Sequence, residues 1–316
     1  MKNFYLVVTA ILIILMLTLP LISLAPEKST LQDTPPEPVE VTDKITVLDT
    51  KTEKTTEITV RDYIFGTVAA EISLGYEDET VKAQAVACYT YLLYKKDKNK
   101  SQNYDITNDS SVDQAYITRQ EALEKWGDNA AEYEEKLNKC LTEVEGIYIS
   151  YENKPIFAAY HAISSGKTES CETVWGNKLP YLVETESLGD LLSPNYLSEK
   201  NVTTEEFKNA FSSLCVLPEG AANYIGEISR SSSGLVKTIQ VGDKVFTGAE
   251  IRKALGLRSA NFDVNFNDNT FVFTVRGYGH GVGLSQNGAE YMAKQGSKYT
   301  EILAWYYKDC KLVTSN

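Results

Sequence analysis

The stretch RGYGHGVGLSQNGAEY, residues 276–291, restricts the fold of this chain more than any other feature. Glycines stand at every second position from Gly277 to Gly283 and surround His280, one of only two histidines. Alternate glycines at a strand end remove side chains from one face, so another group can come close to the backbone. The pattern predicts a tight crossing from a strand into a helix that begins near Gln286. It leaves open whether His280 is a core side chain or part of a site.

The spacing of these glycines excludes the common nucleotide-binding loops. No Gly-Lys-Ser/Thr follows them, and the third glycine of a GxGxxG motif is replaced by Val282, Leu284 or Gln286 in the three possible registers. The net charge of −12 argues against nucleic acid as a partner, because phosphate neutralisation needs clustered Lys and Arg. The sequence therefore predicts neither a nucleotide cofactor nor a nucleic acid partner.

The amino-terminal region predicts a membrane anchor. Residues 4–25 are apolar and uncharged, and at about 1.5 Å per residue they can cross a hydrocarbon core of about 30 Å. They are longer than the usual apolar region of a signal peptide, and Pro26 follows directly, so an uncleaved anchor at 1–25 is favoured over a cleaved signal. Lys2 is the only charge before the apolar run, so the amino end is expected in the cytoplasm. A flexible linker at 26–44, rich in Pro, Glu, Asp and Thr, would follow.

The remaining residues, 45–316, predict one extracytoplasmic domain of the α+β class, since helices and strands do not alternate strictly. Residues 45–60 are β-branched on both sides of a polar centre, which predicts a hairpin. Apolar spacing predicts helices at 61–72 and from Asp78. Further helices are expected at 119–145, between Thr247 and Gly256, from Gln286 and from Thr300, and further strands within 146–164, 224–241 and 261–275.

The five cysteines show no CxxC spacing and are odd in number, so at least one is free or pairs between chains. Each is expected to be a buried, small apolar residue. They stand at positions 88, 140, 171, 215 and 310.

Glu71 is the strongest candidate for acid chemistry. It closes the run FGTVAAE of small and apolar residues and would follow Thr67 and Val68 on one helix face. A carboxyl group in apolar surroundings has a raised pKa and holds a proton near neutral pH, which is the requirement for a general acid. The alternative is an ordinary glutamate at a helix end.

A second polar cluster lies in residues 157–182, at a predicted strand end and the loop that follows. Loops on a rigid sheet commonly bind ligands, and the Tyr, Trp and hydroxyl content suits carbohydrate, although a solvated loop is the alternative. His161 and Cys171 are possible zinc ligands, but two ligands are weak evidence for a metal site. The candidate binding residues of this cluster are Tyr160, His161, Ser164, Ser165, Lys167 and Thr168.

Three segments, in this order, carry a family resemblance: GTVAAEISLGYEDETVKAQAVACYTYLL, YHAISSGKTESCETVWGNKLPYL and VRGYGHGVGLSQNGAEYMAKQGSKYTEILAWYYKDCKL. Together they resemble the stage II sporulation protein D family, which includes autolysin-modifier proteins, over residues 45–313. The resemblance implies a membrane-anchored lytic transglycosylase, a glycan-cleaving lyase that acts on peptide-stripped peptidoglycan strands during forespore engulfment. It also implies a cell-wall amidase and a membrane protein as partners, no required cofactor, and zinc in some members.

The resemblance places the family's catalytic glutamate on Glu71. Such an enzyme needs no second carboxylate, because the C6 hydroxyl of N-acetylmuramic acid is the nucleophile and the product is a 1,6-anhydro end. The glycine stretch is then expected along the glycan cleft. The residues expected to bind substrate or support Glu71 are Gln84, Tyr160, His161, Ser164, Ser165, Lys167, Thr168, Tyr278, His280, Ser285 and Gln286.

Some positions depart from the family's pattern. Tyr89 stands where the family usually has Arg, and Ser165 precedes Gly166 where it often has two glycines. Asn287 replaces an aromatic residue and Trp305 replaces a histidine. These departures keep a second function open, that of a non-catalytic glycan-binding protein that enhances a cell-wall amidase.

Overall fold

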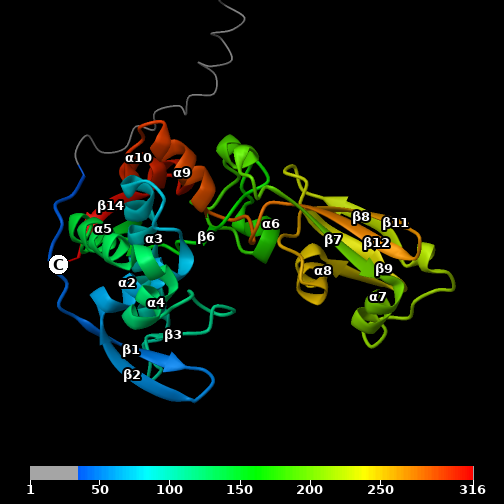
Figure 1. The fold of residues 1–316 in the computed structure, drawn as a ribbon, viewed down its shortest axis with the longest axis horizontal. Coiled ribbons are helices and arrows are strands. Elements are labelled where there is room, and N and C mark those ends of the chain that lie inside the picture. Colours follow the sequence, from blue (N-terminus) through cyan, green and yellow to red (C-terminus); the bar gives the residue numbers. More distant parts are fainter. Residues whose placement is uncertain (1–34, 316) are drawn as a thin grey trace, which may run out of the picture. The chain divides into compact units, whose positions relative to one another are not determined.

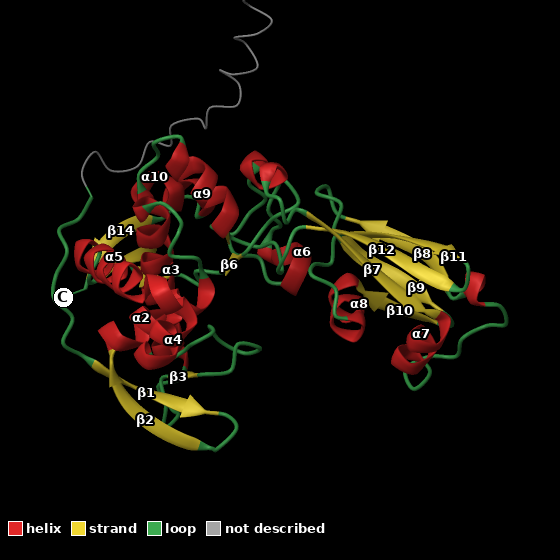
Figure 2. Ribbon diagram, in the orientation of Figure 1, coloured by secondary structure: helices red, strands yellow, loops and turns green. Residues whose placement is uncertain are grey.

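The computed structural model describes residues 35–315 (Figure 1). The predicted anchor at 1–25 and the first part of the predicted linker lie outside the described residues. Within residues 35–315, no helix is long and apolar enough to cross a membrane. Helices and strands are mixed along this part of the chain (Figure 2), which confirms the predicted α+β class.

The helices confirm most of the sequence-based expectations. The predicted helices at 61–72 and from Asp78, Gln286 and Thr300 are all present within a residue or two. The α-helices are α2 (Val60–Glu71), α3 (Asp78–Lys98), α4 (Arg119–Trp126), α5 (Ala130–Glu143), α6 (Cys171–Trp175), α7 (Thr204–Phe211), α8 (Gly248–Leu255), α9 (Gln286–Lys294) and α10 (Tyr299–Tyr306). The 3-10 helices are η1 (Gly127–Asn129), η2 (Leu188–Leu192) and η3 (Ala221–Asn223).

The strands form small sheets whose neighbours are ordered β2-β1-β3, β10-β9-β8, β11-β12-β7, β13-β6 and β14-β4-β5. The predicted hairpin at 45–60 is confirmed as β1 and β2, with Lys44 opposite Thr59. The strands are β1 (Lys44–Asp49), β2 (Lys54–Thr59), β3 (Ile106–Thr107), β4 (Ile147–Tyr151), β5 (Lys154–Pro155), β6 (Tyr160–His161), β7 (Leu197–Thr203), β8 (Ile225–Arg230), β9 (Val236–Val241), β10 (Lys244–Thr247), β11 (Phe262–Asn267), β12 (Thr270–Arg276), β13 (Leu284–Ser285) and β14 (Lys311–Thr314).

The first hydrophobic core draws its buried residues from 45–182 and 282–312. Helix α3 is its main support and contacts α2, α5, α9, α10 and β4. Val81 and Leu92 of α3 are completely buried, as is Val68 of α2. The helix that ends at Glu71 is therefore fixed by packing along most of its length.

The second hydrophobic core is built from residues 202–275. The sheet β11-β12-β7, the sheet β10-β9-β8 and helices α7 and α8 supply it. Aromatic packing is dense there: the rings of Phe207 and Phe271 stack with centroids 4.4 Å apart. The chain leaves the first core after residue 182 and returns to it through the glycine stretch, which thus connects the two cores.

Capping residues decide several helix ends. The Thr247 side chain accepts a hydrogen bond from the backbone of Glu250, and Gly256 ends α8 in the left-handed conformation, as predicted. The charged helix expected at 119–145 is instead two helices. Gly127, with a φ of 55°, ends α4 and donates its N–H to the carbonyl of Leu123, so α5 starts afresh.

The last residues before β1 are tied to the body of the structure. The Val39 N–H donates to the carbonyl of Glu145 at 2.9 Å, and the Val41 N–H donates to the Glu145 carboxylate at 3.2 Å. That carboxylate also pairs with Arg61 at 2.7 Å. The five cysteines, all within the described part of the chain, are buried and unpaired, as expected for small apolar residues.

Candidate functional site

Glu71 is the last residue of α2. Thr59 caps the start of the helix by accepting a hydrogen bond from the Asp62 N–H, and Ile72 leaves the helix in an extended conformation. The helix buries Tyr63, Val68 and other apolar side chains, while Glu71 itself is partly buried. A carboxyl group is thus held at a fixed helix end beside the first core.

The surroundings of Glu71 set its proton affinity. Burial raises the pKa of Glu71 above its ordinary value, because the charged form loses water. The Ala115 N–H donates to Oε1 at 2.9 Å, and this bond and the charge of Lys125 reduce the rise. The Tyr160 hydroxyl also lowers this pKa. The structure therefore gives Glu71 the raised pKa that its apolar sequence context predicted.

A chain of side-chain hydrogen bonds extends from Tyr160. Its hydroxyl donates to Oε1 of Gln114 at 3.0 Å and lies 3.8 Å from the Cys88 sulfur. The Gln84 amide donates to that sulfur at 3.3 Å, and the Gln286 amide donates to Gln84 at 3.3 Å. Gln84, Tyr160 and Gln286, three of the predicted supporting residues, are thus joined in one network that contains Gln114, the sequence neighbour of the Glu71 partner Ala115.

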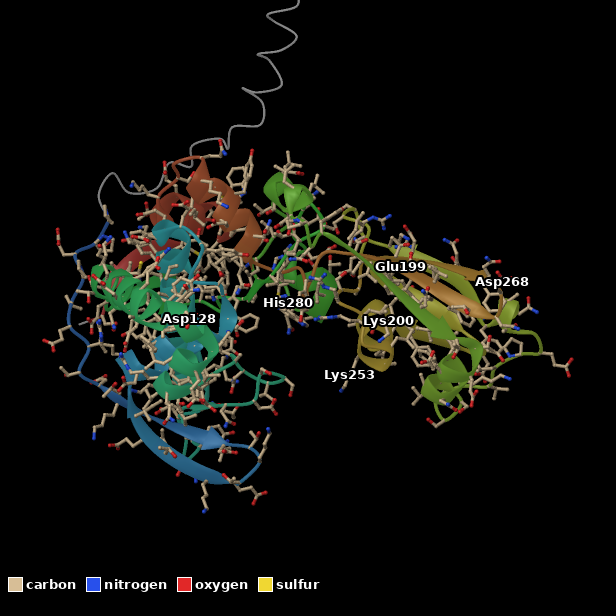
Figure 3. The ribbon with its side chains drawn as sticks, in the orientation of Figure 1. Asp128, Glu199, Lys200, Lys253, Asp268 and His280 are labelled. Atoms are coloured by element: carbon tan, nitrogen blue, oxygen red, sulfur yellow. The ribbon has the colours of Figure 1, made fainter. Side chains whose placement is uncertain are left out.

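The two histidines lie next to each other, with ring centroids 5.7 Å apart. His280, labelled in Figure 3, also packs on Trp175 of α6 with a centroid distance of 4.8 Å. Its Nδ1 accepts from the Val282 N–H, whereas Nδ1 of His161 donates to the Val282 carbonyl, both at 3.1 Å. Burial lowers the pKa of His161 to about 4 and that of His280 to about 3. Both rings are therefore neutral near pH 7.

The predicted zinc ligands were His161 and Cys171. Cys171 is the first residue of α6 and is buried, and burial raises the pKa of its thiol, so its metal-binding thiolate form is disfavoured. Residues 35–315 contain no group of three or more His, Cys, Asp or Glu side chains arranged to hold a metal ion. Among residues 35–315, His161 and Cys171 are thus not joined by a third ligand of this kind, and zinc binding stays a prediction.

Asp190 gathers two predicted residues into a buried cluster. Its carboxylate accepts hydrogen bonds from the hydroxyls of Ser164 at 2.5 Å, Ser187 at 2.9 Å and Ser285 at 2.8 Å. It also accepts from the Ser164 N–H at 3.0 Å. Ser285 is in addition the N-cap of α9. The hydroxyls of Ser164 and Ser285 are thus committed to joining the 163–169 loop, η2 and α9.

A pocket with about 260 Å³ of empty volume lies where the 163–169 loop meets the glycine stretch and Leu235, Ser259 and Asn261. The predicted residues Ser164, Ser165, Lys167 and His280 line it. Lys167 at this pocket pairs with Glu184 at 2.8 Å. The structure therefore brings this set of predicted residues to one pocket.

Glu169 lines the same pocket and is only 2% exposed. Its Oε1 accepts from the hydroxyls of Ser231, at 2.9 Å, and Ser233, and its N–H donates to the carbonyl of Gly281 at 2.7 Å. Burial raises the pKa of Glu169 to about 7. Glu169 thus links the β8–β9 turn, through its carboxyl group, to the glycine stretch, through its backbone N–H.

Two other predicted residues lie apart from these clusters. Thr168 is buried, and its hydroxyl accepts from the Thr185 N–H at 2.9 Å. Tyr278 is 46% exposed, with the Arg258 guanidinium 4.6 Å from its ring centroid. Thr168 has a structural role, whereas Tyr278 is a partly exposed ring that packs against Arg258.

The positions that depart from the family's pattern all have protein partners. The Tyr89 hydroxyl lies 2.7 Å from that of Ser315. The Asn287 side-chain amide donates to the carbonyl of Gly189 at 3.5 Å, and the Trp305 indole donates to the carbonyl of Glu186 at 2.7 Å. Each substituted side chain is therefore accommodated by contacts within the fold.

Sequence reasoning missed Gln114, Ala115, Asp190 and Glu169. Gln114 and Ala115 lie in a polar stretch in which no periodicity distinguishes them. Asp190 carried a usable signal, since it is a single acidic residue within the apolar run LGDLL, the same pattern that identified Glu71.

Comparisons with known proteins agree with the sequence motifs. A family model described as "Stage II sporulation protein" matches residues 48–151. Stage II sporulation protein D of Bacillus amyloliquefaciens is 32% identical over 268 residues, which cover 84% of this chain and 77% of that protein. Its counterpart in Bacillus subtilis (strain 168) is 33% identical over 275 residues, 85% of this chain and 78% of that protein.

A more distant similarity also covers most of this chain. A protein named "Amidase enhancer" from Bacillus subtilis (strain 168) is 24% identical over 300 residues, 79% of this chain and 40% of that protein. The two sporulation proteins are more similar, and they align over most of their own length as well. The chain therefore belongs to the stage II sporulation protein D family.

Proposed function

We propose that this protein is a lytic transglycosylase that cleaves the bond between N-acetylmuramic acid and N-acetylglucosamine in peptide-stripped glycan strands. Membership of the family supports a role on the cell wall during sporulation, which we place in forespore engulfment. The observation that carries the proposal is Glu71, a partly buried carboxyl group with a raised pKa at a rigid helix end. Among the described residues, the groups that shift its pKa include no second carboxylate.

In the first step, protonated Glu71 donates its proton to the oxygen that links the two sugars. The bond between that oxygen and C1 of N-acetylmuramic acid breaks, and the N-acetylglucosamine end leaves as an alcohol. A carboxyl group with a raised pKa suits this step, because it still holds a proton near neutral pH.

In the second step, the Glu71 carboxylate takes the proton of the C6 hydroxyl of the same N-acetylmuramic acid. The C6 oxygen forms a bond to C1, which gives the 1,6-anhydro product and returns Glu71 to its protonated form. No water is consumed, so one carboxyl group serves both steps. An intramolecular nucleophile has a high effective concentration and needs no separate binding site.

The test is digestion of purified, peptide-free glycan strands by the full chain, with the products analysed by mass spectrometry. Wild-type protein is expected to produce 1,6-anhydro ends, which are lighter than hydrolysed ends by one water. Glu71→Gln should lower the rate by about 10²-fold or more. Glu135→Gln, at an exposed position of α5, is the matched control and should retain full activity. Absence of anhydro ends with wild type, or their persistence in Glu71→Gln, would reject the proposal.

A second function is favoured by the similarity to the amidase enhancer. In this case the protein binds glycan and stimulates a cell-wall amidase without cleaving the strand itself. Stimulation of a purified amidase that survives Glu71→Gln would support this function. Loss of stimulation in that variant would count against the enhancer function and favour the lytic transglycosylase.

We further propose that the folded part acts outside the cytoplasm, held at the cell membrane by residues 1–25. An amidase that removes stem peptides would supply its substrate, and a membrane protein of the engulfment machinery would be a second partner. Fractionation of cells that produce the full chain, compared with a chain lacking residues 1–25, tests the anchor. Equal distribution of the two chains would contradict it.

A further inference from the structure

We propose that Arg252 and Arg258 form a carboxylate-binding site that recognises the lactyl carboxylate of N-acetylmuramic acid, the group that becomes free when a stem peptide is removed. The inference deepens the proposed function and rests on it in one respect, namely that the protein binds stripped glycan strands. Two guanidinium groups without a carboxylate partner, both beside the glycine stretch, support it.

The chemistry of a stripped strand requires a cationic site. Where a stem peptide is present, it is joined to the lactyl group of N-acetylmuramic acid through an amide, which is neutral. Hydrolysis of that amide leaves a carboxylate on every second sugar, so a stripped strand is a polyanion. The chain itself has a net charge of −12, so it can attract such a strand only through a local group of positive charges.

Arg252 and Arg258 are distinguished from the other arginines by the absence of a partner. In the described part of the chain, neither side chain forms an ion pair or a hydrogen bond, and both are partly buried. A guanidinium group stays charged in proteins, so this positive charge is uncompensated. Every other arginine pairs with a carboxylate at 2.9 Å or less, namely Arg61, Arg119, Arg230 and Arg276.

The ring of Tyr278 supports Arg258. The guanidinium carbon lies 4.6 Å from the ring centroid, which is a cation–π contact. A guanidinium group that stacks by its face keeps its N–H groups free for hydrogen bonds. The backbone of Tyr278 exchanges two hydrogen bonds with Ile163, and the Gly279 N–H donates to the carbonyl of Arg258 at 3.0 Å. The backbone therefore fixes the ring and Arg258 relative to each other.

Arg252, on α8, lies near the two histidines. Burial lowers the pKa of His280, and the charges of His161 and Arg252 lower it further. Burial also lowers the pKa of His161, and the charge of Arg252 acts in the same direction. The pKa of Arg252 itself is lowered by burial and raised by Tyr278, with no carboxylate of the described residues contributing. Both guanidinium groups thus lie beside Tyr278.

Acidic side chains of the same region are committed to other donors. Glu250 of α8 accepts from the N–H of Thr247 at 2.7 Å and from its hydroxyl at 2.8 Å. Asp263 pairs with two other arginines. Glu169 accepts from the hydroxyl of Ser231 at 2.9 Å. The two guanidinium groups are therefore left to a carboxylate that the ligand supplies.

Two lysines add positive charge around α8. Lys253, next to Arg252 in the sequence, and Lys200 of β7 are exposed and are labelled in Figure 3. The ammonium group of Lys200 lies 3.4 Å from the position of a Cβ on Gly256, the residue that ends α8. The lysines attract an anion as point charges, whereas a guanidinium group can hold a carboxylate through two parallel hydrogen bonds.

Strand β6 connects this site to Glu71. Burial dominates the pKa of Glu71, and the hydroxyl of Tyr160 is one of the groups that lower it. The next residue, His161, lies beside His280, with ring centroids 5.7 Å apart. Consecutive residues of one strand thus connect the surroundings of the proposed acid with those of Arg252. A strand of several sugars is long enough to reach both.

The test compares two ligands on one protein. Oligosaccharides from stripped glycan are used as they are, or after carbodiimide and ammonia have converted each lactyl carboxylate to a neutral carboxamide of similar size. Calorimetry with the full chain carrying Glu71→Gln, which prevents cleavage, should show about 10-fold or more tighter binding of the carboxylate form. Equal affinities would overturn the inference, and this comparison needs no change in either arginine.

Substitutions then locate the site. Arg252→Gln and Arg258→Gln should each reduce the preference for the carboxylate form, and the double variant should bind both forms equally. Arg252→Lys keeps the charge and should retain part of the preference. Lys51→Gln, at an exposed position between β1 and β2, loses the same charge and is the control, with full preference expected. A preference that persists in the double variant would overturn the assignment.

Cleavage assays separate this inference from the proposed function. If both hold, wild-type protein forms 1,6-anhydro ends faster from the carboxylate form than from the carboxamide form. A carboxylate preference that is lost in the arginine variants, in a protein that forms no anhydro ends, would reject the function and keep the site. Anhydro ends formed at equal rates from both forms would keep the function and reject the site.

Discussion

A Cβ atom on Gly283 would lie 2.0 Å from the carbonyl oxygen of Ala159, and the φ of Gly283 is +73°. The same carbonyl accepts the N–H of Leu284 at 3.1 Å, in the parallel pairing of β13 with β6. The close approach that the glycine stretch permits is therefore made, at this position, by the protein's own backbone. It locks the strand of Tyr160 against the start of α9.

Gly283→Ala should consequently destabilise the fold far more than the same substitution at another glycine with a positive φ. The added methyl group meets backbone, which cannot move aside, so we expect a loss of about 4 kcal/mol or more in the free energy of unfolding. Gly296→Ala is the control, because Gly296 has a φ of +92° but nothing within 4 Å of its added Cβ. It should lose only about 1–2 kcal/mol. Urea unfolding of the full chain measures both, and equal losses would contradict the prediction.

Asp190→Ala tests the serine cluster. The substitution leaves the hydroxyls of Ser164, Ser187 and Ser285 without their common acceptor in a buried place. We expect a loss of about 3 kcal/mol or more in unfolding free energy, because buried donors that lose their partner keep the cost of desolvation. Asp128→Ala, at an exposed position labelled in Figure 3, should change stability by less than about 0.5 kcal/mol. Thermal or urea unfolding compares the two, and similar values would argue against a structural role of the cluster.

Glu169 predicts an unusual dependence of stability on pH. Its pKa is about 7 in the folded chain against an ordinary 4.5, so between these values the folded state holds a proton that the unfolded state has released. Stability from this group is complete below pH 4.5 and is lost as the pH rises through 7, up to about 3 kcal/mol in all. Glu169→Gln should remove this fall and gain stability relative to wild type at pH 8. Unfolding curves at several pH values measure this difference. If the free energy of unfolding of the two proteins changes with pH in the same way, Glu169 is not the cause.

His280 should remain neutral throughout the physiological range. Burial lowers its pKa to about 3, and its Nδ1 accepts from the Val282 N–H, which places the ring proton on Nε2. Nitrogen-15 NMR of the imidazole should show no titration between about pH 5 and pH 8. A transition near the ordinary value of 6.5 would mean that the ring is more open to water than its packing on Trp175 implies. A neutral His280 would act by packing and hydrogen bonding, without taking up protons.

Local sequence determined the framework of the site. The apolar spacing of 61–72 produced α2 with Glu71 at its end, and Thr247 with Gly256 fixed both ends of α8. Helix ends and apolar spacing depend on residues within about one helical turn of each other. The sequence alone therefore predicts them. The prediction of one charged helix at 119–145 was wrong in part, because Gly127 ends α4 and the charge pattern continues across it.

Tertiary structure alone decided what surrounds Glu71. Ala115 is 44 residues away in sequence, and Tyr160 reaches Gln114 across 46 residues. Asp190 and Ser285 meet across 95 residues. Hydrogen bonds of this kind join loops that have no periodicity, so local sequence does not predict them. They form only when packing of the cores brings the loops together. The sequence determined which carboxyl group stands at the end of α2, and the packing of distant segments determined its proton affinity and its partners.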